Sequence, residues 1–378
     1  MDEFGFYQNT LTFTILIFTF FVVFLVGCKQ KKDIKIISLI FLWHTFFSYA
    51  YYIFTLFNAA DAVGYYKKAT SIESLYFYPG TPFVVAISSI FTKTIEPSYL
   101  NLTLIFNIFG TSGLVLFYLT IKRYLKTISK YWLIVLFIPS MSFWSAGLGK
   151  DSISFLSICL FLYAITTSKK KSLLILISFF FMFMVRPHIA SMMLISYMIY
   201  FIIQAKIHLL FKVLTLPVIA AGLVLSIGFV QQYIGLEDDS LGSICDYVEG
   251  RQGSNQGGGS SLDIASMSYP MQMFTYVFRP LPFEARSLVS LISSIENTIL
   301  LLLFIYIIYK LKFNLKSFVH DNNLWLFTYV FLTCTILALT TANLGIATRQ
   351  KWMFMPVLIY LLIDAFYKYK LNKTRVYE

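Results

Sequence analysis

The 378-residue sequence has few charged residues. Asp, Glu, Lys and Arg make up 13% of it, hydrophobic residues make up 58%, and the mean hydropathy is +0.73. A soluble domain carries about 25% charged residues. The composition therefore excludes an ordinary soluble protein and predicts an all-α, polytopic integral membrane protein.

Common catalytic and metal-binding motifs are also missing. The four cysteines show no CxxC spacing, so they indicate neither a disulfide framework nor a zinc site. There is no HExxH, no Walker lysine loop and no GxSxG. These absences argue against an intramembrane metalloprotease, an ATP-driven pump and a serine hydrolase. Acidic residues are rare inside the apolar runs, which argues against an ion-coupled transporter.

What the sequence does contain is a long series of apolar runs. We predict a single transmembrane domain over 1–378 with about 11 helices, because runs near 17 residues or longer can cross a bilayer. The predicted spans are 10–27, 36–57, 99–120, 131–147, 152–168, 172–186, 189–205, 208–229, 287–310, 324–342 and 352–367.

The basic residues predict the orientation of these spans. With the N-terminus outside, 20 of the 30 basic residues fall in inside loops, as the positive-inside rule requires. Two loops then lie outside. The first is 58–98, in which 83–92 is too short to cross and fits an interfacial or re-entrant helix. The second is the large loop 230–286, which contains a flexible glycine-serine tract.

Three short charged stretches interrupt the apolar runs. They are Lys150-Asp151, Arg186-Pro187-His188 and Arg349-Gln350-Lys351. Charge at membrane depth is costly and usually functional, so these stretches predict a polar site if all of them open on the same side. Lys150 would bind a phosphate that Asp151 positions, and His188 would transfer a proton. The alternatives are a self-neutralising pair at 150–151 and, for Arg349 and Lys351, an interfacial anchor next to Trp352.

Arginine is enriched in the predicted outside segments. Five of the seven arginines lie there, at Arg186, Arg251, Arg279, Arg286 and Arg349. The planar guanidinium binds phosphate through paired hydrogen bonds, so we predict that these side chains bind an anion. The alternative for Arg279 and Arg286 is a salt-bridge cluster with Glu284 that fixes the loop. Glu296 and Asn297, which follow within the next span, would line the cavity.

The first outside loop begins with a further candidate group. Asp61 follows a span and is backed by Tyr65 and Tyr66, which fits a general base or a sugar-binding group. The alternative is an interfacial aspartate with membrane-belt tyrosines. His44 lies in the middle of a span, and we predict that it is a packed core histidine.

Several of these stretches resemble one family of bacterial membrane proteins. They are Pro139-Ser140-Met141-Ser142-Phe143-Trp144-Ser145 with Lys150-Asp151, then Arg186-Pro187, the loop Arg279-Pro280-Leu281-Pro282-Phe283-Glu284-Ala285, and the late Arg349. This layout resembles the Wzy-type O-antigen and capsule polymerases and, through Asp61, the GT-C membrane glycosyltransferases. One departure is the single large loop, where two are often seen; 58–98 would serve as the second.

The resemblance implies polymerisation of undecaprenyl-pyrophosphate-linked oligosaccharides on the periplasmic face of the bacterial inner membrane. It also implies a chain-length regulator protein as partner, no nucleic acid, no metal and no cofactor. In this interpretation Asp61, His188 and Glu284 are the candidate catalytic bases. The substrate-binding residues are Lys150, Asp151, Arg186, Arg251, Arg279, Arg286, Arg349, Tyr65 and Tyr66. Two alternatives stay open, a GT-C enzyme with a polyprenyl-phosphate sugar donor and a flippase of lipid-linked sugars.

Overall fold

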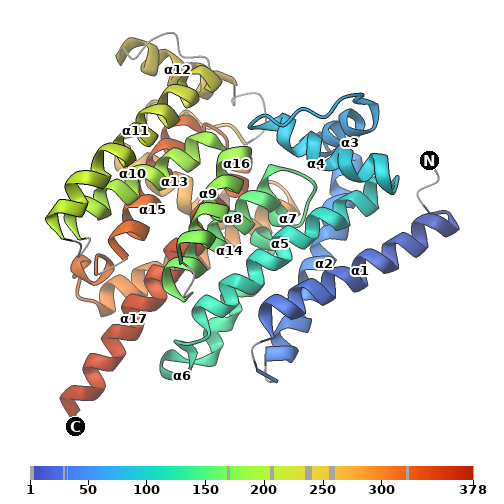
Figure 1. Ribbon diagram of the computed structural model, residues 1–378. Coiled ribbons are helices and arrows are strands. Elements are labelled where there is room, and N and C mark those ends of the chain that lie inside the picture. Colours follow the sequence, from blue (N-terminus) through green and yellow to red (C-terminus); the bar gives the residue numbers. More distant parts are fainter. Residues whose placement is uncertain are drawn as a thin grey trace. The chain divides into compact units, whose positions relative to one another are not determined.

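The structure is a computed structural model that describes residues 4–28, 30–31, 33–167, 171–204, 208–234, 241–254, 260–320 and 323–377. Residues 235–240 and 255–259 of the predicted large loop lie outside this part of the chain. The chain divides into two compact units, Met1–Arg186 and Pro187–Glu378. In the described residues of both units the regular elements are helices, shown in Figure 1.

The described residues of the first unit form ten helical segments. These are α1 (Phe6–Gly27), α2 (Asp33–Phe57), α3 (Asp61–Ser71), α4 (Thr81–Thr94), α5 (Tyr99–Ile121), α6 (Leu125–Ile128), the 3₁₀ helix η1 (Lys130–Phe137), α7 (Pro139–Ser145), α8 (Lys150–Thr166) and α9 (Lys171–Val185).

The second unit contains eleven described helical segments. These are α10 (Pro187–Ile203), α11 (Leu209–Ile234), α12 (Leu241–Ser254), α13 (Tyr269–Phe278), η2 (Pro282–Glu284), α14 (Leu288–Lys310), η3 (Leu315–Phe318), α15 (Asn323–Thr340), α16 (Leu344–Gln350), η4 (Lys351–Met353) and α17 (Met355–Tyr377).

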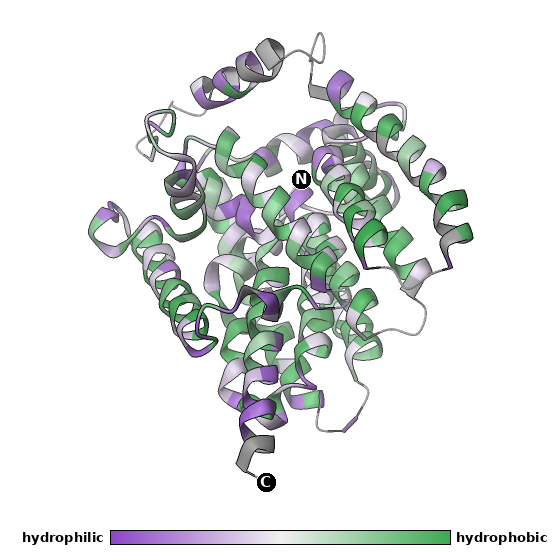
Figure 2. Ribbon diagram, turned by 90° about the vertical axis from the view of Figure 1, so that its left-hand side faces the viewer, coloured by the Kyte–Doolittle hydropathy of each residue, from purple (hydrophilic) through white to green (hydrophobic). Residues whose placement is uncertain are grey.

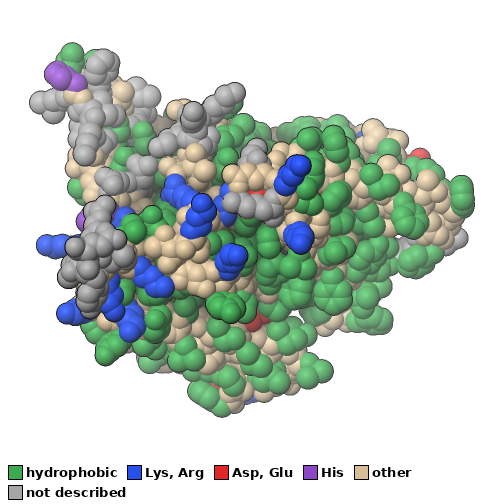
Figure 3. All heavy atoms as spheres, turned by 90° about the horizontal axis from the view of Figure 1, so that it is seen from below, with side chains coloured by type: hydrophobic (Ala, Val, Ile, Leu, Met, Phe, Trp, Pro, Cys, Tyr) green, Lys and Arg blue, Asp and Glu red, His purple; other side chains and the backbone are tan. Residues whose placement is uncertain are grey.

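Several of these helices are membrane spans by length and composition. Six in the described part of the chain are long and apolar enough to cross a bilayer, and the number rises to eight if each of two bent pairs is one span. The protein is therefore an all-helical membrane protein. Hydrophobic colours run along most helices in Figure 2, and hydrophobic side chains cover much of the face shown in Figure 3.

The eleven spans predicted from the sequence exceed this number for identifiable reasons. The predicted span 131–147 is wrong as a single helix, because η1 ends at Phe137 and Pro139 starts α7. The residue before a proline is disfavoured in the helical conformation, and Ile138 is extended here. The helices α8, α9 and α10 hold 17, 15 and 17 residues, which is at or below the length that a span requires.

The first unit is built around α5. This helix is apolar on all sides and almost every residue in it is buried, against α1, α2 and α8. Its few polar side chains bind neighbouring helices. The Nδ2 of Asn101 donates to Oε1 of Gln8 at 2.8 Å, and Thr12 donates its hydroxyl to Oδ1 of Asn101 at 2.7 Å. Such bonds fix the helices relative to one another where hydrophobicity alone gives little specificity.

The second unit packs around α15, which contacts α10, α13 and α17. The indole Nε1 of Trp325 donates to the carbonyl of Met193 at 3.2 Å. The Tyr329 hydroxyl donates to the carbonyl of Met353 at 2.9 Å. These two bonds join α15 to α10 and to the break between η4 and α17.

Candidate active site

An ion pair joins the start of α8 to the residue after α9. The two helices pack against each other as a hairpin, with Ser157 and Ser178 each donating a hydroxyl to the other's carbonyl at 2.7 Å. The first turn of α8 therefore lies beside the end of α9. There, Nη2 of Arg186 donates to Oδ1 of Asp151 at 2.6 Å, and the two side chains are 11% and 12% exposed. The structure thus brings together two of the charged stretches singled out in the sequence.

This ion pair leaves part of the arginine without a partner. The Nε of Arg186 is buried and has no hydrogen-bond acceptor among the described residues. A buried donor without an acceptor costs about 1–3 kcal/mol, and more when the group is charged. A guanidinium has five N–H donors, so Arg186 has donors available for a ligand anion in addition to the one that Asp151 accepts.

The turn before Lys150 is buried and tightly packed. The axes of α7 and α8 differ by 115°, and the break between them spans 146–149. A Cβ on Gly147 would overlap the ring of Tyr51 from α2, so the close approach requires glycine. The Ser145 hydroxyl lies 2.9 Å from Nε2 of His44. Lys150 and Asp151 follow this bend directly, as the first two residues of α8.

His44 fixes this bend from the centre of the unit. The side chain is fully buried, as predicted for a core histidine, and its Nδ1 lies 2.5 Å from Oδ1 of Asn107 and 3.1 Å from the Thr111 hydroxyl. It therefore joins α2, α5 and α7 through hydrogen bonds. Its place in mid-span was apparent from the sequence, but its connection to the bend before Lys150 was not.

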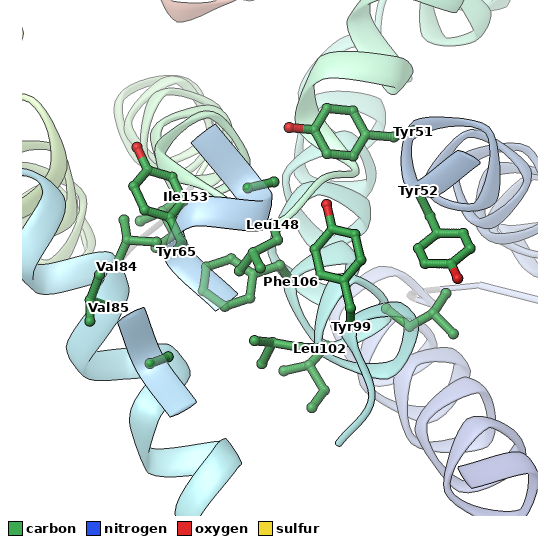
Figure 4. Packing of buried hydrophobic residues seen from close by; sticks show 14 of the residues in the cluster. Tyr51, Tyr52, Tyr65, Val84, Val85, Tyr99, Leu102, Phe106, Leu148 and Ile153 are labelled. Carbon is green, nitrogen blue, oxygen red and sulfur yellow. The ribbon is translucent and has the colours of Figure 1, made fainter. Parts of the chain in front are cut away.

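Tyr65 connects the first predicted outside loop to the same turn. A Cβ on Gly149 would lie 3.5 Å from the Tyr65 ring. The buried cluster around Tyr65 includes Leu148 and Ile153 (Figure 4), and Val185 also belongs to it. Asp61 is exposed at the first position of α3. Residues four apart are about one turn apart on a helix, so Asp61 lies one turn before Tyr65.

The rest of the 58–98 loop is anchored at two places. The backbone N–H of Gly80 donates to the carbonyl of Met184 at 2.8 Å, two residues before Arg186. Gly80 has a φ of 95°, a conformation that glycine adopts without strain. The Tyr66 hydroxyl donates to the carbonyl of Pro97 at 3.1 Å. The 58–98 loop thus contains two helices, α3 and α4, and makes a backbone contact with the end of α9.

In the second unit, Arg279 binds Glu284 across the turn that contains η2. The Nε of Arg279 donates to both carboxylate oxygens, at 2.8 and 3.1 Å, and Nη2 donates to Oε1. The N–H of Leu281 donates to Oε2 at 2.7 Å. Burial raises the pKa of the Glu284 carboxyl, but these hydrogen bonds outweigh it and hold the pKa below its ordinary value. The salt bridge considered as an alternative for this loop is therefore present for Arg279.

A buried lysine lies at the helix break of the second unit, between α16 and α17. Lys351 is 1% exposed, and its ammonium donates to Oδ1 of Asn297. The Nδ2 of Asn297 donates to the carbonyl of Pro280 at 3.2 Å. The alternative of an interfacial anchor is thus wrong for Lys351, because its head group is inside the protein. The sequence signal that could have revealed this is the pairing of Glu296-Asn297 in one span with a lysine in another.

The remaining predicted residues occupy separate elements of the second unit. His188 is half-buried in the first turn of α10, and Arg349 is half-buried in α16. Arg251 is exposed in α12, and Arg286 is exposed between η2 and α14. In the part of the chain that the structure covers, no group of three His, Cys, Asp or Glu side chains is arranged to hold a metal ion.

Residues 86–377, about three quarters of the chain, match the sequence model of the EpsG family. No curated protein and no solved structure matches the chain significantly.

Proposed function

The chain belongs to the EpsG family of polysaccharide polymerase-type membrane proteins, and we propose that it joins undecaprenyl-pyrophosphate-linked repeat units on the periplasmic face. At the level of the family it is a glycosyltransferase-like enzyme of polysaccharide synthesis. The finer assignment concerns the substrate and the leaving group, and it rests on the chemistry of the residues around Arg186.

The observation that supports the proposal is the state of the Arg186 guanidinium. Its Nη2 donates a hydrogen bond to Asp151, and the Arg186 side chain is 11% exposed. Its buried Nε has no acceptor among the described residues. Lys150 starts the same turn of α8 as Asp151. An arginine oriented by a carboxylate, with a lysine next to that carboxylate, fits a diphosphate, which offers several anionic oxygens to each donor.

The proposed reaction is displacement at an anomeric carbon. A hydroxyl oxygen of the acceptor forms a bond to the anomeric carbon of the donor sugar, and the bond from that carbon to the pyrophosphate oxygen breaks. The electron pair of the broken bond goes to the pyrophosphate, and the hydroxyl proton goes to a base. Negative charge grows on the leaving group, so Arg186 and Lys150 would stabilise the transition state more than the bound substrate.

Asp61 is the base that we propose from the first unit. Asp61 is exposed at the start of α3, one turn before Tyr65, whose ring a Cβ on Gly149 would approach to 3.5 Å. Glu284 fits a positioning role for Arg279 better than a base, because its bound carboxylate has a lowered pKa and accepts a proton weakly. His188 stays a candidate from the sequence.

Deletion of the gene tests the class of reaction. Loss of a polymerase leaves a single repeat unit on its lipid or on the cell surface. A decorating glycosyltransferase of the GT-C type would instead leave full-length but altered chains. Loss of a flippase would trap the repeat unit on the cytoplasmic face of the membrane. Only the first product supports the proposal.

Complementation of the deletion with Arg186→Lys tests the residue. Lysine keeps the charge but loses the planar fork, and removal of one preorganised donor costs about 100–1,000-fold in rate. The matched control is Arg123→Lys. Arg123 donates to the carbonyl of Thr166, the last residue of α8, and to the hydroxyl of its neighbour Tyr124. It therefore lies at the end of α8 opposite Asp151. Long chains in the Arg186→Lys strain, at wild-type protein levels, would exclude Arg186 from the reaction.

A further inference from the structure

The segment between α3 and α4 exposes a leucine followed by aromatic side chains. Leu75, Tyr76 and Phe77 are 46%, 60% and 54% exposed, and they precede the turn at Pro79-Gly80. A group of large apolar side chains that the rest of the protein leaves uncovered commonly marks a binding surface. The proposed reaction at Arg186 does not involve these residues.

The exposed segment is fixed at both ends. At its start, Nζ of Lys93 donates to the carbonyl of Glu73 at 2.8 Å. In its middle, the Phe77 ring meets the Phe83 ring of α4 edge-on, with centroids 6.4 Å apart. At its end, Gly80 donates to Met184 of α9. The aromatic side chains are therefore presented by a backbone that three contacts hold in place.

Tyr76 and Tyr78 form a flat pair on the side opposite Phe77. Their ring centroids are 5.8 Å apart and the ring planes differ by 9°. Side chains two apart in a non-helical segment point the same way, which is why the two tyrosines stack while Phe77 packs on α4. The outer ring, Tyr76, is the more exposed of the stack.

The chemistry of a flat, exposed tyrosine stack fits a sugar ring. One face of a pyranose is a layer of C–H groups that packs on the electron-rich face of an aromatic ring. The hydroxyl groups at the edge of the sugar can at the same time bind the phenol groups or water. Binding of a sugar costs little side-chain conformational entropy, because the two tyrosine rings already hold each other in place.

The position of the stack relates it to Arg186. Tyr78 lies two residues before Gly80, and Arg186 lies two residues after the Met184 carbonyl that Gly80 binds. At about 3.6 Å per residue, the backbone path allows roughly 20 Å at most between these two positions. A diphosphate bound at Arg186 would therefore place the sugars of its own oligosaccharide within reach of the stack.

We propose that Tyr76 and Tyr78 form a carbohydrate subsite that binds a sugar ring of the lipid-linked repeat unit beyond the one attached to the diphosphate. This inference rests on the proposed function for the identity of the oligosaccharide. The subsite itself recognises a pyranose face, so it can be measured without lipid, diphosphate or catalysis.

The test uses the full-length protein in lipid nanodiscs. The probe is the oligosaccharide released by mild acid from the lipid-linked repeat units of the source cells, titrated calorimetrically. We expect Tyr76→Ala to lower the affinity about tenfold, which corresponds to the loss of one stacking contact, and Tyr76→Phe to change it by less than about threefold. The matched control is Tyr131→Ala, since Tyr131 is 89% exposed in η1 of the same unit.

Three results would overturn the subsite. They are no binding of the oligosaccharide by the wild-type protein, unchanged affinity in Tyr76→Ala, and an equal loss in Tyr131→Ala. A separate result would also overturn it. If brominated lipids quench the added fluorescence of a Tyr76→Trp variant, the stack faces lipid and not a bound sugar. Because the probe has no diphosphate, these results stand apart from the Arg186→Lys complementation, and either hypothesis can fail alone.

Discussion

The guanidinium of Arg186 donates to the carboxylate of Asp151 at 2.6 Å, and its buried Nε has no acceptor in the described part of the chain. The carboxylate thus orients the guanidinium without using all of its donors. Both residues also suit their helix ends, because a carboxylate is favoured in the first turn of α8 and a cation at the end of α9. Asp151 therefore orients Arg186, and the guanidinium keeps donors for an anionic substrate.

Asp151→Asn should separate orientation from charge. The amide keeps the shape of the carboxylate but loses its charge, so Arg186 is held less firmly in the site. We expect polymerisation by purified protein in liposomes to fall about tenfold to 100-fold, the range for loss of a charged hydrogen bond. The control is Asp246→Asn, an exposed aspartate in α12. Wild-type turnover in Asp151→Asn would contradict an orienting role for Asp151.

Gly147→Ala should disrupt the buried turn that carries Lys150. The added methyl group would overlap the Tyr51 ring, so the turn or α2 must shift. We expect loss of polymer in cells at near-normal protein levels, and partial recovery when Tyr51→Leu makes room. Gly64→Ala in α3 is the control, because a Cβ there meets no heavy atom within 4 Å among the described residues. Failure of Tyr51→Leu to restore any polymer would contradict this explanation.

The sequence alone predicts the class of the fold and part of the site. Apolar runs predict a helical membrane protein, and the rarity of charge draws attention to Lys150, Asp151 and Arg186. The partnership of Asp151 with Arg186 could not be predicted, because it depends on how α8 and α9 pack.

Broken helices account for most of what sequence reasoning missed. Pro139 divides an apolar run that hydropathy treats as continuous, and the bends at 146–149 and near Lys351 leave no periodic signal. The burial of Lys351 depends on an amide from another helix, Asn297, and such long-range partners are invisible to composition.

The Arg279–Glu284 pair should make the stability of the protein depend on pH in the acidic range. The pKa of Glu284 in the folded protein is below its ordinary value of 4.5, so the stabilisation is fully present above that value. It is lost as the pH falls through the lowered folded-state pKa. We expect wild type to exceed Glu284→Gln by about 1–3 kcal/mol near neutral pH, and the difference to shrink below about pH 4.

Thermal unfolding in detergent across this pH range measures the difference. Glu249→Gln is the control, since Glu249 is exposed in α12. A difference between wild type and Glu284→Gln that is the same at low and neutral pH would contradict the assignment of the effect to the Glu284 carboxylate.

Asn297 and Lys351 should be coupled in stability. Asn297→Leu removes the carbonyl that accepts a hydrogen bond from a buried ammonium, which should cost about 1.5–3 kcal/mol. Adding Lys351→Met removes the stranded charge, so the double variant should be more stable than Asn297→Leu alone. The measurement is unfolding in detergent of Asn297→Leu, Lys351→Met and the double variant, and additive effects would show that the two side chains do not interact.

The central claim is that the Arg186 side chain binds the diphosphate of the lipid carrier. The most direct measurement is the affinity of the nanodisc-embedded protein for undecaprenyl pyrophosphate, compared between wild type, Arg186→Lys and the control Arg123→Lys. We expect Arg186→Lys to weaken binding about tenfold to 100-fold and Arg123→Lys to leave it unchanged. Equal affinities of wild type and Arg186→Lys would contradict the claim.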